Sequence, residues 1–376
     1  MRQRKNNWQW LATAALLLTA FSIVGCSSVN PYFDMTKKHH TSEGFRNNYG
    51  SSVVKPLGSL IKWQFEAFQN GVPKAPSEFI KGYEGFPVIK PNVPALIENC
   101  TDSAQKKSGR CKQISITWIG HATVLVQMGG LNILTDPHFS ERTFAVQFIG
   151  PKRKVPLPIT LAQLPRIDLV VISHNHYDHL DSGTVDQLNK QNGGAPIFAV
   201  PLGIDLWLKD RGINNVERFD WWDKKTLLGL EVNFVPAQHW SSRSPFDRNA
   251  TLWGGWVLKE SGEGGKSLYF AGDTGISKDF ADIGARFGSI DFSLIPVGAY
   301  EPRWFMKDQH VNPEEAVQIH QDVRSRWSLG IHWGTFELTD EPLDQPIGDL
   351  PKALDKAQVS RDDFVLFKHG ETRFFK

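Results

Sequence analysis

The chain has 376 residues, of which 40% are hydrophobic and 22% are charged, a composition typical of a globular protein long enough to bury a full core. Lys and Arg number 42, against 40 Asp and Glu. This balance excludes the strongly basic face with which nucleic-acid-binding proteins displace counterions, so we expect no nucleic-acid partner.

Residues 1–25 have the pattern of an export signal. Three basic residues among the first five precede an apolar run over residues 11–24, and Gly25 directly precedes Cys26. The run is shorter than the ~20 apolar residues of a membrane span. The junction resembles the lipobox of a bacterial lipoprotein, which predicts cleavage before Cys26 and lipidation of that cysteine. The alternatives are an ordinary signal peptide and an uncleaved anchor.

The lipobox resemblance implies a lipid-anchored protein of the bacterial cell envelope, with the membrane surface as a partner. Ser27 rather than Asp follows the cysteine, which in a Gram-negative cell is similar to lipoproteins sorted to the outer membrane. We therefore expect the chain to face the periplasm from that membrane. Loss of residues 1–25 removes three basic residues and no acidic one, which leaves 39 basic against 40 acidic residues.

Residues 26–50 are polar and rich in turn formers, and we interpret them as a tether. Residues 51–112 form a proline-rich N-terminal extension that contains an amphipathic helical pattern over residues 57–69. The apolar stripe of this pattern consists of Leu57, Leu60, Ile61, Phe65 and Phe68, with Trp63 beside it. Amphipathic helices usually pack against a core, which is the favoured interpretation here. The alternative is that part of the helix faces a bilayer.

Cys100 and Cys111 are the other two cysteines of the chain, and the residues between them are polar. Outside the cytoplasm, two cysteines this close in sequence are expected to form a disulfide. The alternative is a pair of free thiols.

Residues 113–376 consist of short apolar segments separated by Gly and Pro and interleaved with helical patterns. Continuous apolar strands indicate sheets covered on both faces, and the interleaved helices favour α/β layers over a β-sandwich. One clear helix follows Asn312, a good N-cap, with Pro313 in its first position. We interpret this region as one domain.

Four of the apolar segments end in titratable side chains. The set consists of His174, His176, Asp178 and His179 after one segment, and of His239, Asp273 and His332 after three others. Burial of such groups without partners is costly, and imidazole and carboxylate groups suit Zn²⁺. Seven ligands are too many for one tetrahedral ion but fit two ions that share a carboxylate. The alternative is a set of structural polar residues.

The H-x-H-x-D-H element at residues 174–179 and the spaced His, Asp and His after it resemble the binuclear metallo-β-lactamase superfamily. From about Phe45 to the C-terminus, the chain is similar to the N-acyl-phosphatidylethanolamine-hydrolysing phospholipase D family. The stretches that carry this similarity include TWIGHATVLV, LTDPHFS, GPKR, DWW, PAQHW, FAGDTG, GAYEPRWFM, QHVNPEEAVQIH and IHWGTF. The resemblance implies a four-layer αββα sandwich over residues 113–376.

The resemblance also implies two Zn²⁺ ions as cofactors. The first ion would bind His174, His176 and His239. The second would bind Asp178, His179 and His332, while Asp273 bridges both. Asp178 and Asp273 would be catalytic residues because they would bind these ions.

Other residues are implied to act around the ions. His121 and Asp136 would orient ligands, the alternative being a packed histidine and a turn-stabilising aspartate. Gln147, Gln309 and His310 are expected on the substrate side, and His310 would contact the phosphate or donate a proton. The alternative for His310 is a histidine that caps the following helix.

The implied reaction is hydrolysis of a membrane phospholipid, N-acyl-phosphatidylethanolamine, to N-acylethanolamine and phosphatidic acid by a metal-bridging hydroxide. No Ser or Cys has a recognisable nucleophile setting, which favours direct hydrolysis. One alternative is a hydrolase of another ester, lactone or phosphodiester on the same fold, and a more distant one is a non-catalytic metal-binding lipoprotein. The acyl-chain preference, the loaded metal and the oligomeric state, a homodimer included, stay open.

Overall fold

The structure is a computed structural model that describes residues 29–50, 53, 55–72, 74, 76, 79–101 and 111–375. Cys26 and the predicted export signal lie outside the described residues. Within the described ranges, every helix is too short or too polar to cross a bilayer.

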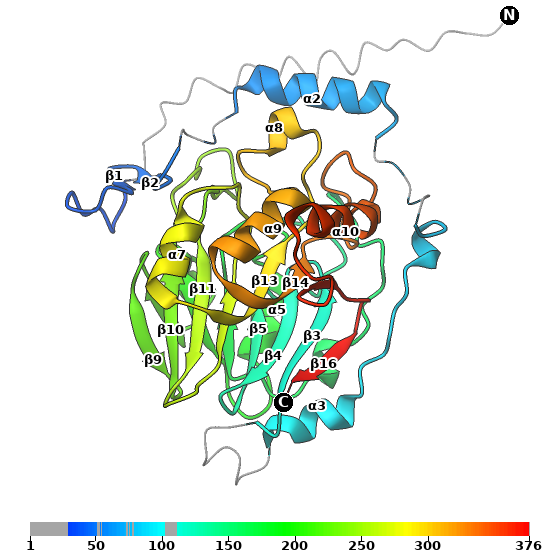
Figure 1. Cartoon of the computed structure of the whole chain (residues 1–376). Helices are drawn as coiled ribbons and strands as arrows, with labels where there is room; N and C mark the ends of the chain where they lie inside the picture. The colour runs from blue at the N-terminus through cyan, green and yellow to red at the C-terminus, as the bar shows by residue number, and fades with distance from the viewer. Residues whose placement is uncertain are drawn as a thin grey trace, which may run out of the picture.

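Two seven-stranded sheets pack face to face in the centre of the molecule (Figure 1). The first sheet has the order β9 (Lys224–Leu227), β10 (Leu230–Val235), β11 (Gly255–Glu260), β12 (Ser267–Phe270), β13 (Ile290–Pro296), β14 (Ser325–Ile331), β15 (Phe364–Leu366). The second has the order β16 (Thr372–Phe375), β3 (Ile114–Gly120), β4 (Thr123–Met128), β5 (Leu131–Thr135), β6 (Leu169–Val171), β7 (Ile197–Pro201), β8 (Val216–Phe219). Most of these strand residues are buried, as their apolar sequences predict.

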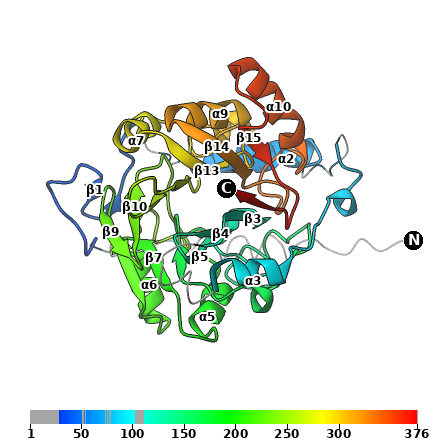
Figure 2. The same cartoon turned by 60° about the horizontal axis from the view of Figure 1, so that its bottom comes forward.

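Helices cover the outer face of each sheet (Figure 2). One outer layer consists of α7 (Asp279–Phe287), α9 (Pro313–Asp322) and α10 (Gln345–Ala357), and the other of α3 (Val93–Thr101), α5 (Ser182–Asn189) and α6 (Ile204–Asp210). The short elements are β1 (His40–Thr41), β2 (Gly44–Phe45), η1 (Tyr83–Gly85), η2 (Leu161–Gln163) and α8 (Arg303–Met306). The predicted four-layer αββα sandwich is therefore confirmed, although one outer layer includes α3, which lies before the predicted start at residue 113.

The predicted helix after Asn312 is α9, and its start follows from local chemistry. The Asn312 side chain accepts a hydrogen bond from the Glu315 backbone N–H at 2.9 Å, and the Glu315 carboxylate accepts from the Asn312 N–H at 3.0 Å. This capping box, with Pro313 in the first turn, satisfies N–H groups that have no partner within the helix. The helix α9 packs against β13 and β14. Its cap therefore also fixes the end of the loop that leads into α9.

Strand directions bring four loops together at one edge of the sandwich. β12, β13 and β14 are mutually parallel, and β10 runs in the same direction because both β10 and β12 are antiparallel to β11. In the second sheet, β5 and β6 are parallel. The segments that carry the seven titratable residues all follow the carboxyl ends of such strands, which is where α/β sheets place their ligand sites.

The described part of the expected tether is a docked segment. Phe45 is buried, and the carboxylate of Asp220 lies 2.7 Å from Nε2 of His39 and 3.0 Å from Nε2 of His40. The Lys37 ammonium contacts the same carboxylate. Polar composition alone predicts a solvated chain here, whereas these partners lie 180 or more residues away in the sequence.

The helix predicted over residues 57–69 forms as α2 (Leu57–Gln69), but its apolar stripe does not pack against the domain. The exposed fractions of the stripe side chains are 71% for Leu57, 41% for Leu60, 61% for Ile61, 59% for Phe65 and 83% for Phe68. The opposite edge of α2 docks on α8 instead (Figure 1). The Trp63 ring stacks on the Phe305 ring at 4.9 Å, and its N–H donates to Asp340 at 2.8 Å. The favoured prediction for the stripe is therefore wrong, because the helix docks through Trp63 and the buried Ala67, which lie on another face.

Cys100 and Cys111, both in the expected extension, form the predicted disulfide. Cys100 lies in α3 and is fully buried, and Cys111 precedes β3. The residues between 102 and 110 lie outside the described ranges.

Candidate metal centre

The seven residues predicted as metal ligands converge into two neighbouring groups. In the first, Nδ1 of His176 lies 2.8 Å from Nε2 of His174 and 3.3 Å from Nε2 of His239. Two facing imidazole nitrogens cannot both carry a proton at such a separation. Three lone pairs that point at one place fit a single cation.

The second group surrounds the Asp178 carboxylate. Its Oδ2 atom lies 3.2 Å from Nε2 of His179, 3.4 Å from Nε2 of His332 and 2.9 Å from Nε2 of His121. His121 thus lies against the side chain of a predicted ligand, as its expected orienting role requires. These four residues form a second arrangement with the spacing of a cation site.

Asp273 lies between the two groups. Its Oδ2 atom is 3.2 Å from Nε2 of His179, 3.2 Å from Nε2 of His332 and 3.9 Å from Nε2 of His239. One carboxylate therefore reaches nitrogens of both groups, which is the geometry that a shared ligand needs.

The chemistry of the donor set fits divalent metal ions. Oδ1 of Asp273, Nε2 of His179 and Nε2 of His332 are buried atoms without a hydrogen-bond partner in the described part of the chain. Buried polar atoms are otherwise nearly always satisfied. Bound cations would satisfy all three atoms, whereas a purely structural cluster would leave them unpaired.

Neighbouring groups hold the histidine rings in place. Ser173, directly before the predicted ligands, contacts Nδ1 of His174 at 2.9 Å, and Asp136 contacts Nδ1 of His179 at 2.7 Å. The Gln309 carbonyl accepts from Nδ1 of His239 at 2.9 Å. Each contact occupies Nδ1 and leaves Nε2 for a metal ion, the usual arrangement around metal-binding histidines. Asp136 is placed as predicted, whereas Ser173 and the Gln309 carbonyl were not anticipated.

Electrostatics separates the histidines into two kinds. Burial and the neighbouring histidines hold the pKa of His174 and of His239 well below the usual range, and burial lowers the pKa of His176 to about 3. Burial alone would also lower the pKa of His179, but the carboxylates of Asp273 and Asp178 outweigh it and raise that pKa well above the usual range. The first group is therefore ready to bind a metal ion, while His179 must release a proton on binding.

Three residues of the centre have a left-handed backbone conformation that L side chains rarely adopt. The φ angles are 55° for His121, 32° for Asp136 and 63° for His332. Gly298 packs so closely on His332 that a Cβ at Gly298 would lie 2.2 Å from the His332 carbonyl oxygen. Such strain concentrates at functional sites, where the surrounding fold enforces it.

The structure brings His310 to the centre. Its Nδ1 atom is buried without a partner in the described residues and lies 3.7 Å from Oδ2 of Asp273. Burial lowers the pKa of His310 to about 4, so the ring is neutral near neutral pH. Gln309 contributes its backbone carbonyl to His239, and its side chain contacts the Met306 sulfur at 3.4 Å.

Gln147 has a local role in the structure. Both ends of its amide bond the Arg142 backbone, at 3.0 and 3.1 Å, and the side chain lies on an exposed loop. None of its hydrogen bonds leads to the centre, so nothing in the described geometry supports the expected substrate contact.

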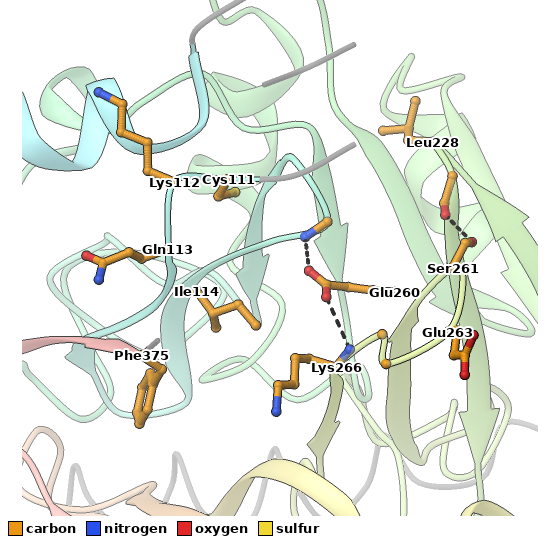
Figure 3. Close-up of a pocket in the computed structure, with 14 residues that line it drawn as sticks. Cys111, Lys112, Gln113, Ile114, Leu228, Glu260, Ser261, Glu263, Lys266 and Phe375 are labelled. Carbon is orange, nitrogen blue, oxygen red and sulfur yellow. Dashed lines mark hydrogen bonds between the residues drawn. The ribbon is translucent and has the colours of Figure 1, made fainter. Parts of the chain in front are cut away.

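A cavity of about 790 Å³ opens at the opposite end of the sandwich, among the turns that join β4 to β5, β9 to β10 and β11 to β12 (Figure 3). Glu260 accepts hydrogen bonds there from the N–H groups of Gly129, at 2.7 Å, and Lys266, at 3.1 Å. These bonds tie turns of the two sheets to each other. The cavity is remote from the histidines, and we place the candidate site at the metal centre.

The fold and the two groups of ligands define a class of protein, and comparison with known proteins agrees. The beta-lactamase superfamily domain matches residues 131–333. The chain belongs to the metallo-β-lactamase superfamily and is a metal-dependent hydrolase.

Among its relatives is N-acyl-phosphatidylethanolamine-hydrolyzing phospholipase D 1 from Caenorhabditis elegans, which is 42% identical over 267 residues, or 68% of this chain and 74% of that protein. The mitochondrial N-acyl-phosphatidylethanolamine-hydrolyzing phospholipase D of Saccharomyces cerevisiae is 38% identical over 262 residues, 68% of this chain and 53% of that protein. An isothiocyanate hydrolase structure from Delia radicum gut bacteria superposes with a TM-score of 0.55 at 21% identity, over 69% of this chain and 99% of that one. At that identity, the structure shows the shared fold alone.

Proposed function

We propose that the chain is a zinc-dependent phosphodiesterase of the phospholipase D type that hydrolyses N-acyl-phosphatidylethanolamine. The 42% identity over 267 residues to the Caenorhabditis elegans enzyme carries this proposal, because the similarity extends well beyond the ligands that the superfamily shares. The products would be N-acylethanolamine and phosphatidic acid.

The ligand set supports two zinc ions. His174, His176 and His239 would hold one ion, Asp178, His179 and His332 the other, and Asp273 would bind both. Imidazole nitrogen and carboxylate oxygen are the donors that Zn²⁺ prefers in catalytic sites.

When bound, such a metal pair lowers the pKa of water and neutralises charge on a phosphoryl group. In the proposed reaction, water adds its oxygen to phosphorus and the bond from phosphorus to the ethanolamine oxygen breaks. One proton of that water passes to the leaving oxygen, so the products are a phosphate monoester and an alcohol. Asp136, Ser173 and the Gln309 carbonyl would hold the ligand rings in a fixed orientation through this change, so that little reorganisation is needed.

His310 would contact the substrate phosphate. A ring with a pKa of about 4 is neutral at neutral pH, and nearby dications would lower that pKa further. His310 would therefore contribute a hydrogen bond from its neutral ring to phosphoryl oxygen or to water. This interpretation favours the phosphate-contacting role over proton donation.

The exposed stripe of α2 supports contact with a lipid surface. α2 lies over α8, four residues before His310, and Lys55 ahead of α2 pairs with Asp308 at 2.5 Å. Phe144 is also exposed, and its ring lies 5.3 Å from that of Tyr177 in the loop that carries the predicted ligands. Exposed apolar groups on α2 and on this loop suit a substrate that must be drawn from a bilayer.

We also propose that a lipid on Cys26 anchors the chain in the cell envelope, on the outer membrane facing the periplasm. The sequence pattern of residues 1–27 supports this location. With the anchor supplying affinity, α2 would orient the site toward the lipid.

The test is incubation of purified, zinc-loaded protein with vesicles that contain N-acylated and ordinary phosphatidylethanolamine, with products identified by mass spectrometry. We expect N-acylethanolamine and phosphatidic acid from the N-acylated lipid, and no turnover after chelation. Parallel assays with a β-lactam and a lactone test the alternative hydrolases. A kcat/KM for either that exceeds the phospholipid value by orders of magnitude would reject the phosphodiesterase, and no turnover of any substrate would favour a metal-binding lipoprotein.

A further inference from the structure

Asn47, in the N-terminal segment, bonds both backbone groups of a predicted metal ligand. Its Nδ2 donates to the His239 carbonyl at 3.0 Å, and its Oδ1 accepts from the His239 N–H at 3.0 Å. Oδ1 also accepts from Nε1 of Trp253 at 3.0 Å. Because one end of the amide meets an acceptor and the other meets two donors, the orientation of the Asn47 side chain is determined by its partners.

The two bonds matter because the His239 N–H and carbonyl have no other hydrogen-bond partner in the described part of the chain, whereas the preceding residue, Gln238, is held by its own bridge to Gly275. His239 is 1% exposed and lies beyond the end of β10, outside any strand. Without Asn47, a buried N–H and a buried carbonyl would lose their partners, and the loop would move to satisfy them.

A shift of this backbone would reach the metal position directly. The His239 ring is held on its other side by the Gln309 carbonyl, which leaves Nε2 facing Nδ1 of His176 at 3.3 Å. Backbone and ring together therefore set where this nitrogen lies. Partners that orient a ligand in this way typically contribute 10–100-fold, as an order of magnitude, to metal affinity.

Asn47 is itself well anchored. Tyr49, two residues further on, donates a hydrogen bond from its hydroxyl to Asp282 of α7 at 2.7 Å. On the other side, His39 and His40 bond Asp220. The segment is thus held on both sides of the amide that bonds His239.

We propose that Asn47 is a positioning residue of the metal centre, whose side chain clamps the His239 backbone and so completes the site formed with His174 and His176. The inference rests on the proposed metal function. It makes a segment about 190 residues upstream of His239 part of that site.

The test compares Asn47→Ala and Asn47→Asp with the matched variant Asn48→Ala, which removes a neighbouring amide that bonds Asp279 of α7 instead of the centre. Metal-free proteins are titrated with Zn²⁺ against a chromophoric chelator, and circular dichroism and thermal melts report folding. We expect Asn47→Ala to weaken one of the two zinc sites by about 10–100-fold, with the second site unchanged. Asn47→Asp, which keeps the acceptor and loses the donor, should also weaken that site. Asn48→Ala should bind zinc as the wild type does.

The outcomes separate the clamp from the metal function. A wild-type chain that binds no zinc would reject the metal centre itself. Folded Asn47 variants with both sites at wild-type affinity would reject the clamp alone. A fall in melting temperature without a fall in affinity, equal zinc losses in the Asn48 variant, or failure of both Asn47 variants to fold would assign Asn47 a general structural role and overturn the proposal.

Discussion

Nδ1 of His179 lies 2.7 Å from Oδ2 of Asp136, and both side chains are fully shielded from solvent. The contact holds the ring so that Nε2 faces Asp178 and Asp273. We predict that Asp136→Ala lowers the zinc affinity of the site formed with Asp178 and His332 by about 10–100-fold while the fold is retained. Chelator competition measures the affinity. Asp168→Asn, a buried aspartate beside the other end of β6, serves as the control and should bind zinc normally.

Asp273→Asn should keep the shape of the side chain but remove the charge that reaches both groups of ligands. An amide is a poor bridging ligand, so we predict loss of at least one metal equivalent and of nearly all activity. Elemental analysis and turnover measure the two effects. The matched control is Asp279→Asn, at a residue outside the centre. Burial raises the pKa of Asp279 and so disfavours its charged form, which makes the neutral amide a mild replacement. Two bound metals with wild-type turnover in Asp273→Asn would rule out the shared ligand.

His310→Ala should lower kcat on the order of 100-fold, because a positioned hydrogen-bonding group is lost beside the substrate. Zinc content should stay at the wild-type value, since His310 is not one of the seven predicted ligands and its ring nitrogen is 3.7 Å from Asp273. His320→Ala removes another buried histidine, on α9, and should leave kcat unchanged in folded protein. Unchanged kcat in the His310 variant would remove this residue from the reaction.

The exposed stripe of α2 can be tested separately from its docking edge. The combined change Ile61→Ser, Phe65→Ser and Phe68→Ser removes apolar groups that face solvent, so we predict lost vesicle binding in unlipidated protein and normal hydrolysis of a soluble short-chain substrate. Trp63→Ser is the matched variant. It removes the stack on Phe305 and the bond to Asp340, and should lower the melting temperature. Unchanged vesicle binding of the triple variant would contradict a lipid-facing helix.

The contacts of Asp220 with Lys37, His39 and His40 predict that the stability of the docked N-terminal segment depends on pH. Burial alone would raise the pKa of Asp220, but His39 and Lys37 outweigh it and hold the pKa well below the usual range. A carboxyl with a depressed folded-state pKa stabilises the fold above its unfolded pKa of about 3.9, and this stability is lost as the pH falls below that value. Asp220→Asn should therefore lower the free energy of unfolding by about 2 kcal/mol at pH 7 and by progressively less in acid.

Urea titrations across the pH range measure this effect. Asp362→Asn, an exposed change, serves as the control and should leave the unfolding free energy unchanged at every pH. An Asp220→Asn penalty that stays constant down to pH 3 would show that the carboxylate charge is not what holds the segment.

The sequence by itself determined the features that depend on neighbours in the chain. Asn312, Pro313 and Glu315 lie within one turn, so the start of α9 follows from local hydrogen bonding. The loop from His174 to His179 follows a buried strand, and its spacing predicts a metal site before any fold is known. The resemblance of these and other stretches to a known family indicated the αββα sandwich and the class of enzyme.

Tertiary structure decided what depends on residues far apart. Asn47 and His239 are separated by 192 positions, and no local pattern in a polar stretch marks an amide that will meet a particular backbone. The direction in which α2 faces was decided the same way, since an apolar stripe fits a core or a lipid equally well. Long-range contacts of the opposite edge, such as the stack of Trp63 on Phe305 and its bond to Asp340, leave the stripe facing outward. Hydrophobic periodicity indicates that a helix has an apolar and a polar face, whereas long-range contacts determine which face is buried.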